Sequence, residues 1–161
     1  MKINTQYYNE FWAFLKSNGI KNFTPDEVLN CEENSNGTIK QDADSGVYND
    51  PPHQKIWEAC IPVLKTLEEV RDELGIYIVV NSFWRDHHYN RVVGGTANSY
   101  HTKFIAADIV PHYKNGRLYP IIAFYDYLDK KLGDAWGLQE YDNRVHIDSR
   151  EEKYRKTYYR R

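Results

Sequence analysis

The sequence predicts an α+β fold, with a small antiparallel sheet flanked by helices. Apolar residues recur at helical spacing mainly in the first half of the chain, and the short runs that are typical of strands lie in the second half. This order favours the α+β class, because α/β sheets need helices and strands that alternate along the chain. The 161 residues fit one domain with a single core.

Three helices are expected in the first part of the chain. Residues 5–17 place apolar side chains on one helical face, and Thr24 followed by Pro25 is typical of the start of a second, short helix. Residues 53–74 carry the longest apolar stripe. They form the main packing helix, which Pro62 should kink.

Residues 31–52 are rich in Asn, Asp, Ser and Gly and have few apolar anchors, which predicts a surface loop. The two cysteines, Cys31 and Cys60, lack Cys-x-x-Cys spacing and offer neither a disulfide framework nor a thiolate zinc site. Nothing in the sequence favours a bridge between them. Cys60 is expected to be a plain core residue.

The second half of the chain contains the predicted strands. Residues 76–80 form a β-branched run that we expect to be an interior strand, and residues 104–110 return to an apolar run after a long polar loop. A helix is expected over residues 119–132. The last predicted element is a hairpin with strands over residues 136–140 and 144–148.

Charge and hydropathy exclude several classes of protein. The formal net charge is -2, so the field of the whole molecule does not favour nucleic acid, and no nucleic-acid partner is expected. No stretch approaches about 20 consecutive apolar residues, and the N-terminus lacks the apolar run of a signal peptide. We therefore expect cytoplasmic synthesis without a signal peptide and without membrane insertion, and we expect a monomer.

Residues 151–161 form a basic aromatic tail in which tyrosines are interleaved with lysines and arginines. Such a composition can contact nucleic acid or an anionic polymer. Chain ends of this kind are more often a solvated last helix, which is the structure we expect here.

His101, Asp108 and His146 are candidate metal ligands. A catalytic zinc ion takes three protein nitrogen or oxygen ligands at about 2.0 to 2.2 Å and keeps one position for water. Six histidines and 23 acidic residues offer many such triples, so spacing alone does not select this one. The remaining histidines that we considered are expected to be ordinary exposed side chains: His53, His87, His88 and His112.

The order of several short motifs is more specific than any one of them. Over roughly residues 52–150 this order resembles the zinc D-alanyl-D-alanine carboxypeptidases and L-alanyl-D-glutamate endopeptidases, which share their fold with the hedgehog signalling domain. The resemblance implies a hedgehog-like peptidase fold and a single peptidase domain over residues 1–161. The motifs that carry it are Ser82-Phe83-Trp84-Arg85, Gly94-Gly95, Ser99-Tyr100-His101, Ala106-Ala107-Asp108 and Val145-His146-Ile147-Asp148.

The resemblance also assigns roles to individual residues. It implies that His101, Asp108 and His146 bind Zn2+. It implies further that Arg85 contacts a carbonyl or carboxylate of the substrate, where a guanidinium can hold a carboxylate or stabilise an oxyanion.

Two further side chains lie close to the implied ligands in the sequence. Ser99 could orient the loop or a ligand, or it could bond to the local backbone, as turn hydroxyls do. Asp148 shares a strand face with His146 and is expected to orient that histidine or a helper group.

Two positions depart from the family pattern. Phe104 stands where the family has glycine, three residues after His101, so that the backbone could run differently or the ring could shape the pocket. Asn143 stands where several branches place the general base, and an amide cannot accept a proton. The nearest acids are Glu140 and Asp142.

Of these two acids, Glu140 is the favoured general base and Asp142 is the alternative. A three-residue turn would pair Glu140 with Arg144 and place it on the face of His146. A two-residue turn would point Glu140 away from that face.

The activity that the resemblance implies is hydrolysis of peptide bonds in the stems of bacterial peptidoglycan, by a carboxypeptidase or an endopeptidase. The small size and the missing signal peptide suggest a phage or prophage endolysin that reaches the cell wall after release by a holin. Two other functions remain open: a non-catalytic zinc-containing binding module on the same fold, and a virion structural protein whose basic tail docks onto an anionic partner.

Overall fold

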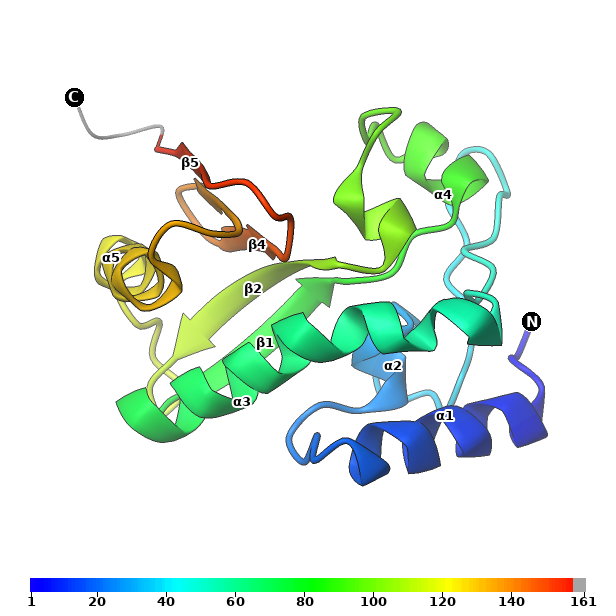
Figure 1. The fold of residues 1–161 in the computed structure, drawn as a ribbon. Coiled ribbons are helices and arrows are strands. Elements are labelled where there is room, and N and C mark those ends of the chain that lie inside the picture. The colour runs from blue at the N-terminus through cyan, green and yellow to red at the C-terminus, as the bar shows by residue number, and fades with distance from the viewer. Residues whose placement is uncertain (158–161) are drawn as a thin grey trace.

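The computed structural model describes residues 1–157 and confirms the α+β class. A five-stranded sheet stands at the centre, α3 runs along it, and α5 packs beside its last strands (Figure 1). No helix within these residues is long and apolar enough to cross a membrane. The elements are α1 (Thr5–Ser17), α2 (Pro25–Val28), η1 (Gln54–Cys60), α3 (Ile61–Leu74), β1 (Tyr77–Ser82), α4 (His87–Val92), η2 (Tyr100–Lys103), β2 (Ala106–His112), α5 (Ile121–Leu132), β3 (Gly137–Glu140), β4 (Val145–Asp148) and β5 (Tyr154–Lys156).

The strands follow the order β1-β2-β4-β3-β5 across the sheet. The pairs from β1 to β3 are antiparallel, as expected, whereas β5 runs parallel to β3 and makes the sheet mixed. The expectation that the first strand is an interior strand is wrong, because β1 lies at the edge of the sheet. Its side chains alternate accordingly: Ile78 is buried, whereas Tyr77 and Val79 are exposed.

The helices lie close to their predicted positions. α1 spans the predicted residues, and α2 begins with a capping box in which Thr24 and Glu27 each bond to the other's backbone N–H. One correction concerns the main helix, whose first part is the 3-10 helix η1, so that α3 begins only at Ile61. Pro62 lies in the first turn of α3 and begins that helix instead of kinking it, because a first-turn N–H has no partner in the helix.

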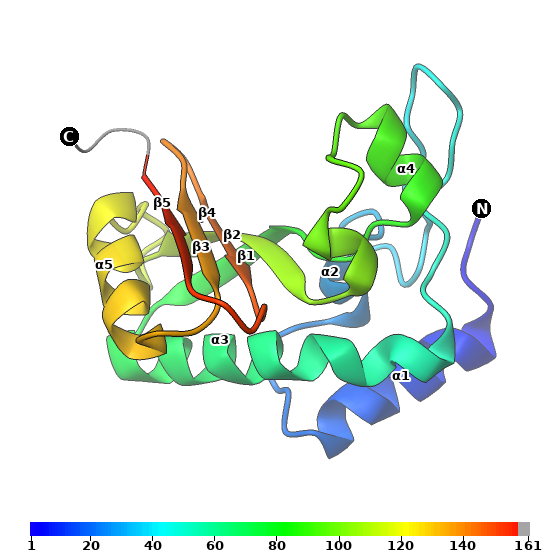
Figure 2. The same ribbon diagram turned by 45° about the horizontal axis from the view of Figure 1, so that its top comes forward.

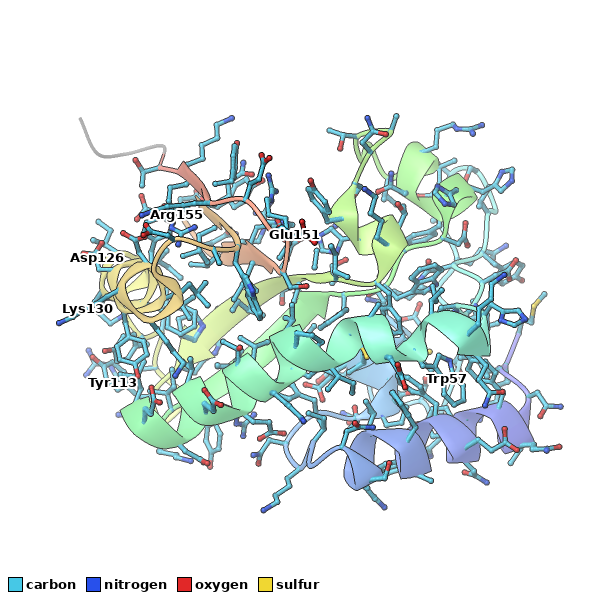
Figure 3. All side chains as sticks on the ribbon, viewed as in Figure 1. Trp57, Tyr113, Asp126, Lys130, Glu151 and Arg155 are labelled. Carbon is cyan, nitrogen blue, oxygen red and sulfur yellow. The ribbon has the colours of Figure 1, made fainter. Side chains whose placement is uncertain are left out.

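Aromatic rings fill the core beneath the sheet and helices. Trp57, on η1, lies against α1 (Figure 3), where its ring meets Phe11 at a centroid distance of 5.0 Å. The ring of Phe11 also stacks on Phe104, with the two centroids 6.2 Å apart. These contacts tie α1 to the segment that follows η2.

Residues 31–52 contain no helix or strand, in keeping with the predicted loop, but they are fixed to the domain. An isolated bridge joins Cys31 to Ile39, and Asn49 is only 2% exposed. Cys31 and Cys60 are both buried and free, so the bridge that the sequence left open is not formed. The polar loop after β1 also contains two short helices, α4 and η2, that the sequence pattern does not predict.

The C-terminal segment is a strand where a helix was expected. β5 pairs with β3, and Arg155 lies beside α5 (Figure 3). Its guanidinium bonds to Asp129 on α5 and to the carbonyl oxygen of Trp136. These contacts anchor one face of β5 on α5. The remainder of the predicted basic tail, Tyr158–Arg161, lies outside the described residues.

Candidate metal centre

The three candidate ligands converge from three elements. His101 comes from η2, while Asp108 and His146 face each other across the β2–β4 ladder. His101 Nε2 lies 3.4 Å from Asp108 Oδ2, and His146 Nδ1 lies 2.9 Å from Asp108 Oδ1. One ligand atom from each residue therefore lies within 4.8 Å of the other two, which is close enough for all three to bind one ion.

The backbone fixes the tautomer of His101. Its Nδ1 lies 2.6 Å from the carbonyl oxygen of Phe83, and a carbonyl can only accept a hydrogen bond. Nδ1 therefore carries the proton in the neutral ring, and Nε2 presents its lone pair toward Asp108. Because His101 is 3% exposed, its ring has little freedom to turn away.

A buried carboxylate fixes the tautomer of His146 in the same way. Asp148 Oδ2 lies 3.0 Å from His146 Nε2. Burial acts to raise the pKa of Asp148, but hydrogen bonds from Arg150 and His146 outweigh it and hold the pKa well below its usual range. The charged carboxylate accepts the Nε2 proton, so that Nδ1 of the neutral ring presents its lone pair toward Asp108.

This donor set fits a divalent metal ion. Two histidine lone pairs and the carboxylate of Asp108 point toward one another. Because all three groups are electron-rich, this arrangement is stabilised by a positive charge between them. Burial lowers the pKa of His146, but the contacts with Asp108 and Asp148 outweigh burial and raise it, as expected for a position that favours a positive charge. Burial lowers the pKa of His101. Metal binding would displace the proton of His146, as is usual for histidine ligands.

Arg150 and Gly137 support Asp148, and the sequence reasoning missed both. Arg150 Nε and Nη2 donate to the two oxygens of Asp148 at 2.7 and 2.6 Å. Gly137 pairs with Asp148 across the β3–β4 ladder, and a Cβ at this glycine would lie 2.4 Å from Asp148 Oδ2. The spacing of His146, Asp148 and Arg150 at every second residue is the sequence signal that could have revealed Arg150.

Arg85 points into the same centre, and the substrate contact that the resemblance implies for it stays a prediction. Its Nη2 lies 3.2 Å from Asp108 Oδ2, and its Nε donates to the hydroxyl of Ser82. Asp108 thus orients the guanidinium beside the candidate metal position. A carboxylate or a developing oxyanion at that position would lie within reach of the same cation.

Asn49 brackets the backbone of Arg85, although it lies in the predicted surface loop. Its Nδ2 donates to the carbonyl oxygen of Trp84 at 3.2 Å, and its Oδ1 accepts from the N–H of Asp86 at 2.9 Å. Asn30 Nδ2 donates to the same carbonyl at 3.1 Å. The residues on both sides of Arg85 are therefore fixed by buried amides. No local pattern in the sequence indicates this role, because the partners lie far apart along the chain.

Phe104 keeps the backbone conformation that glycine favours. Its φ is 64°, in the left-handed region, where it forms the C-cap of η2. The side chain is fully buried, and its ring contacts those of Phe83, Trp84 and Phe11. Phe104 therefore adds a ring to the core, but the backbone after His101 keeps the conformation that a glycine would adopt there.

Ser99 caps the helix that carries His101. Its hydroxyl accepts from the N–H of His101, and its carbonyl oxygen accepts from the hydroxyl of Thr102. Of the two roles left open by the sequence, the observed contacts are those of a local backbone cap.

The geometry expected of Glu140 is wrong. Glu140 pairs with Val145, and the N–H of Tyr141 bonds to the carbonyl oxygen of Arg144, so the turn consists of only two residues. Glu140 is 1% exposed and lies on the core face of the sheet, while Gln139 occupies the face of His146. The face shared with His146 therefore holds an amide where a carboxylate was expected.

Asp142 does not replace Glu140 at the centre. It lies in the exposed two-residue turn, four positions from His146. Among the described residues that line the groove beside the centre, Asp108 is the only carboxylate.

A groove of about 670 Å³ runs past the three candidate ligands. One wall is the segment that carries Gly94, Gly95 and η2, and the other is formed by β4, β3 and β5. Figure 2 shows these two groups of elements on either side of the start of β2. A Cβ at Gly95 would lie 1.9 Å from Asn90 Oδ1, so the first wall needs glycine for its close packing.

The other histidines take no part in the centre. Within the described residues, the group that could hold a metal contains His101 and His146 alone among histidines. His53, His87 and His88 are exposed, as expected, whereas His112 is half-buried at the end of β2, so the exposed position expected for it is wrong.

The groove of this α+β domain holds two histidines with fixed tautomers, an aspartate and an adjacent arginine. Such a set of side chains is typical of the active site of a metallopeptidase. The chain belongs to the peptidase M15 family, whose family model matches residues 21–148. Members of this family are zinc metallopeptidases, and the match agrees with the resemblance to the D-alanyl-D-alanine carboxypeptidases. Searches of curated proteins and of solved structures each gave no significant match.

Proposed function

We propose that the protein is a zinc-dependent peptidase that hydrolyses peptide bonds in the stems of bacterial peptidoglycan. The observation that carries the proposal is the pair of fixed tautomers. Phe83 and Asp148 turn a lone pair of each histidine toward Asp108, as a metal site requires. Membership in the M15 family supports a peptidase, and the motif resemblance supports the peptidoglycan substrate.

The residues that would hold zinc are His101 through Nε2, Asp108 through a carboxylate oxygen and His146 through Nδ1. Zinc bound there would act as a Lewis acid toward the scissile carbonyl and would lower the pKa of a water molecule. Arg85, oriented by Asp108, would hold a substrate carboxylate or the oxygen that gains charge during hydrolysis.

Metal content and muropeptide release together test this proposal. The wild type is expected to hold one zinc per chain and to release muropeptides from purified sacculi. His101→Ala is expected to lose both. His88→Ala is the matched control, because His88 is exposed and lies outside the candidate metal group. If His101→Ala retains the zinc content and the release rate of the wild type, the proposed centre is wrong.

The bond that is cleaved and the biological setting are parts of the same proposal. Mass spectrometry of the products distinguishes the two activities, because a carboxypeptidase releases a terminal D-alanine and an endopeptidase separates the stem. We further propose that the protein acts as a lysis enzyme of a phage or prophage, a role that lysis in the presence of a holin tests. Co-expression with a holin in a susceptible host is expected to lyse the cells, and His101→Ala is expected to abolish the lysis.

A non-catalytic zinc-binding module is the second candidate function. The observation that favours it is the groove lining, in which Asp108 is the only carboxylate among the described residues, so a separate general base of that kind is lacking. It predicts one zinc per chain and binding to sacculi, with no release of muropeptides by the wild type. The same measurements therefore separate the two functions.

A further inference from the structure

The two walls of the groove stand on either side of the start of β2 (Figure 2), and they meet beside Arg150. Arg150 follows β4 on one wall, and Tyr100 begins η2 on the other. The guanidinium carbon of Arg150 lies 4.3 Å from the centroid of the Tyr100 ring and 4.5 Å from that of Tyr154, which begins β5. All three side chains line the groove. Arg150 therefore bridges the groove from one wall to the other.

The backbones of the two walls are joined at the same end. The N–H of Ser149, after β4, donates to the carbonyl oxygen of Ile105 at 3.1 Å. The N–H of Ile105, before β2, donates in turn to the carbonyl oxygen of Tyr100 at 3.3 Å. The contact between Tyr100 and Arg150 thus lies where the chain itself joins the two walls. Together these contacts close this end of the groove.

Arg150 is held firmly in its bridging position. Its Nε and Nη2 donate to the two oxygens of Asp148 at 2.7 and 2.6 Å, and Asp148 is fully buried. The carbonyl oxygen of Arg150 accepts from the N–H of Trp136 at 3.2 Å. A bidentate ion pair fixes the plane of a guanidinium, and aromatic rings beside it add cation–π attraction. The closed end is therefore a fixed part of the fold.

The closed end lies close to the candidate metal position. Asp148 Oδ2 is 3.0 Å from His146 Nε2 and 2.6 Å from Arg150 Nη2, so one carboxylate oxygen separates the histidine ring from the bridging guanidinium. On the opposite wall, Tyr100 directly precedes the ligand His101. Because an extended peptide spans about 3.3 to 3.6 Å per residue, the space between the metal position and the bridge takes about one residue.

Arg144, which lies on the other side of His146, forms no such bridge. It lines the groove two residues before His146, whereas Arg150 follows that histidine by four. Its guanidinium carbon lies 3.9 Å from the centroid of the Tyr141 ring, and its Nη1 donates to Asn143 Oδ1. In the described part of the chain these side-chain contacts stay on its own hairpin. A peptide that passes the metal position from this side meets the closed end next.

The chemistry of the closed end favours a carboxylate as the end of the substrate. Arg150 uses Nε and Nη2 to hold Asp148, and among the described residues no acceptor bonds to its Nη1. The side chain of Arg150 is 20% exposed, whereas that of Asp148 is 0% exposed. A free ammonium would therefore meet the cation, because the carboxylate that balances it is buried. A terminal carboxylate would instead accept a hydrogen bond from the guanidinium.

We propose that Tyr100, Arg150 and Tyr154 determine the length of the substrate and limit it to peptides that end in a free carboxylate about one residue beyond the scissile bond. This inference rests on the proposed peptidase function and makes the protein an exopeptidase that removes carboxy-terminal residues. Longer peptides are excluded because they clash with the bridge. The three side chains act on the choice of substrate, whereas the reacting bond lies at the metal centre.

Two substrate lengths test this inference. The short substrate is a synthetic stem pentapeptide that ends in D-Ala-D-Ala with a free carboxylate. The long substrate carries a glycine extension after the last D-alanine. Hydrolysis of the D-Ala-D-Ala bond is measured by product release, and binding is measured by titration calorimetry with ketomethylene analogues that cannot be hydrolysed at that bond. Zinc-loaded protein is used throughout.

The variants separate the rings of the closed end from the rest of the groove. Y100A/Y154A removes both rings and leaves Asp148 as the partner of Arg150. Y100F keeps the first ring and removes only its hydroxyl. Y113A is the matched control, because Tyr113 is exposed and does not line the groove. Circular dichroism and zinc content show whether each variant is folded and loaded.

The glycine extension is expected to lower kcat/KM and the binding affinity by about 100-fold for the wild type, Y100F and Y113A. Y100A/Y154A is expected to bind and cleave both lengths alike. Equal treatment of both lengths by the wild type, absence of binding, or an unchanged preference in Y100A/Y154A would each overturn the inference. Selective binding of the short analogue without hydrolysis would sustain the closed end and refute the peptidase function, whereas equal hydrolysis of both lengths by the wild type would do the reverse.

Discussion

Replacing Asp148 by asparagine is expected to weaken zinc binding by about 10- to 100-fold, or about 1.4 to 2.8 kcal/mol. Asp148 is fully buried, and Arg150 donates to both of its oxygens while His146 Nε2 lies 3.0 Å from one of them. An amide has the same size but only one acceptor atom. If its NH2 group faces His146, the ring proton moves to Nδ1, where it competes with the metal.

Competition with a chelator of known affinity measures this loss. Glu151→Gln is the matched control, because Glu151 is an exposed acid near the end of β4 (Figure 3) and its loss changes the net charge by the same amount. Circular dichroism of the zinc-free proteins checks that each variant is folded. If Asp148→Asn binds zinc within twofold of the wild type, Asp148 does not set the tautomer of His146 and the reasoning is refuted.

Three further outcomes are expected. Asn49→Ala removes both hydrogen bonds that bracket Arg85, so kcat/KM should fall by about tenfold while metal content, measured by mass spectrometry, stays unchanged. Phe104→Gly relieves about 1 kcal/mol of left-handed strain but removes a buried ring, so urea unfolding should show a net loss of about 2 to 4 kcal/mol; a gain in stability would contradict the packing role. Burial raises the pKa of Cys31 to about 12 and raises that of Cys60 as well. A thiol reagent at pH 8 should therefore label neither in the native protein and both in urea, and the thiol contribution to stability should be complete below about pH 8.5 and decline as the pH rises toward 12.

The sequence predicts those parts of the fold that depend on neighbouring residues. α1 and the β3–β4 hairpin follow from local apolar spacing and turn residues, so they lie where they were expected. The place of β1 at the edge depends on which strands pair, and a β-branched run contains no information on its partners. β5 is only three residues long and is held by Arg155, so its pattern cannot be distinguished from that of a polar tail.

The metal ligands could be predicted because ordered motifs surround them in the sequence. The residues that orient these ligands and Arg85 could not be predicted. His101, Asp108 and His146 lie together as the resemblance implies. Asn49 acts on Arg85 through contacts that only the folded chain brings together. Glu140 was misplaced because a difference of one residue in turn length reverses the face of every side chain in the strand.

The two departures from the family pattern have different consequences. Phe104 adopts the left-handed backbone conformation that glycine favours, and its ring packs in the core. The metal centre is therefore unchanged by this substitution. Asn143 lies in the two-residue turn, and the strand register places Gln139 beside His146 on the groove face. Any proton acceptor in catalysis must therefore come from outside the carboxylates of β3 and its turn, because Glu140 faces the core and Asp142 lies at the exposed tip. The choice between a peptidase and a binding module thus depends on proton transfer, while both functions require the same metal ligands.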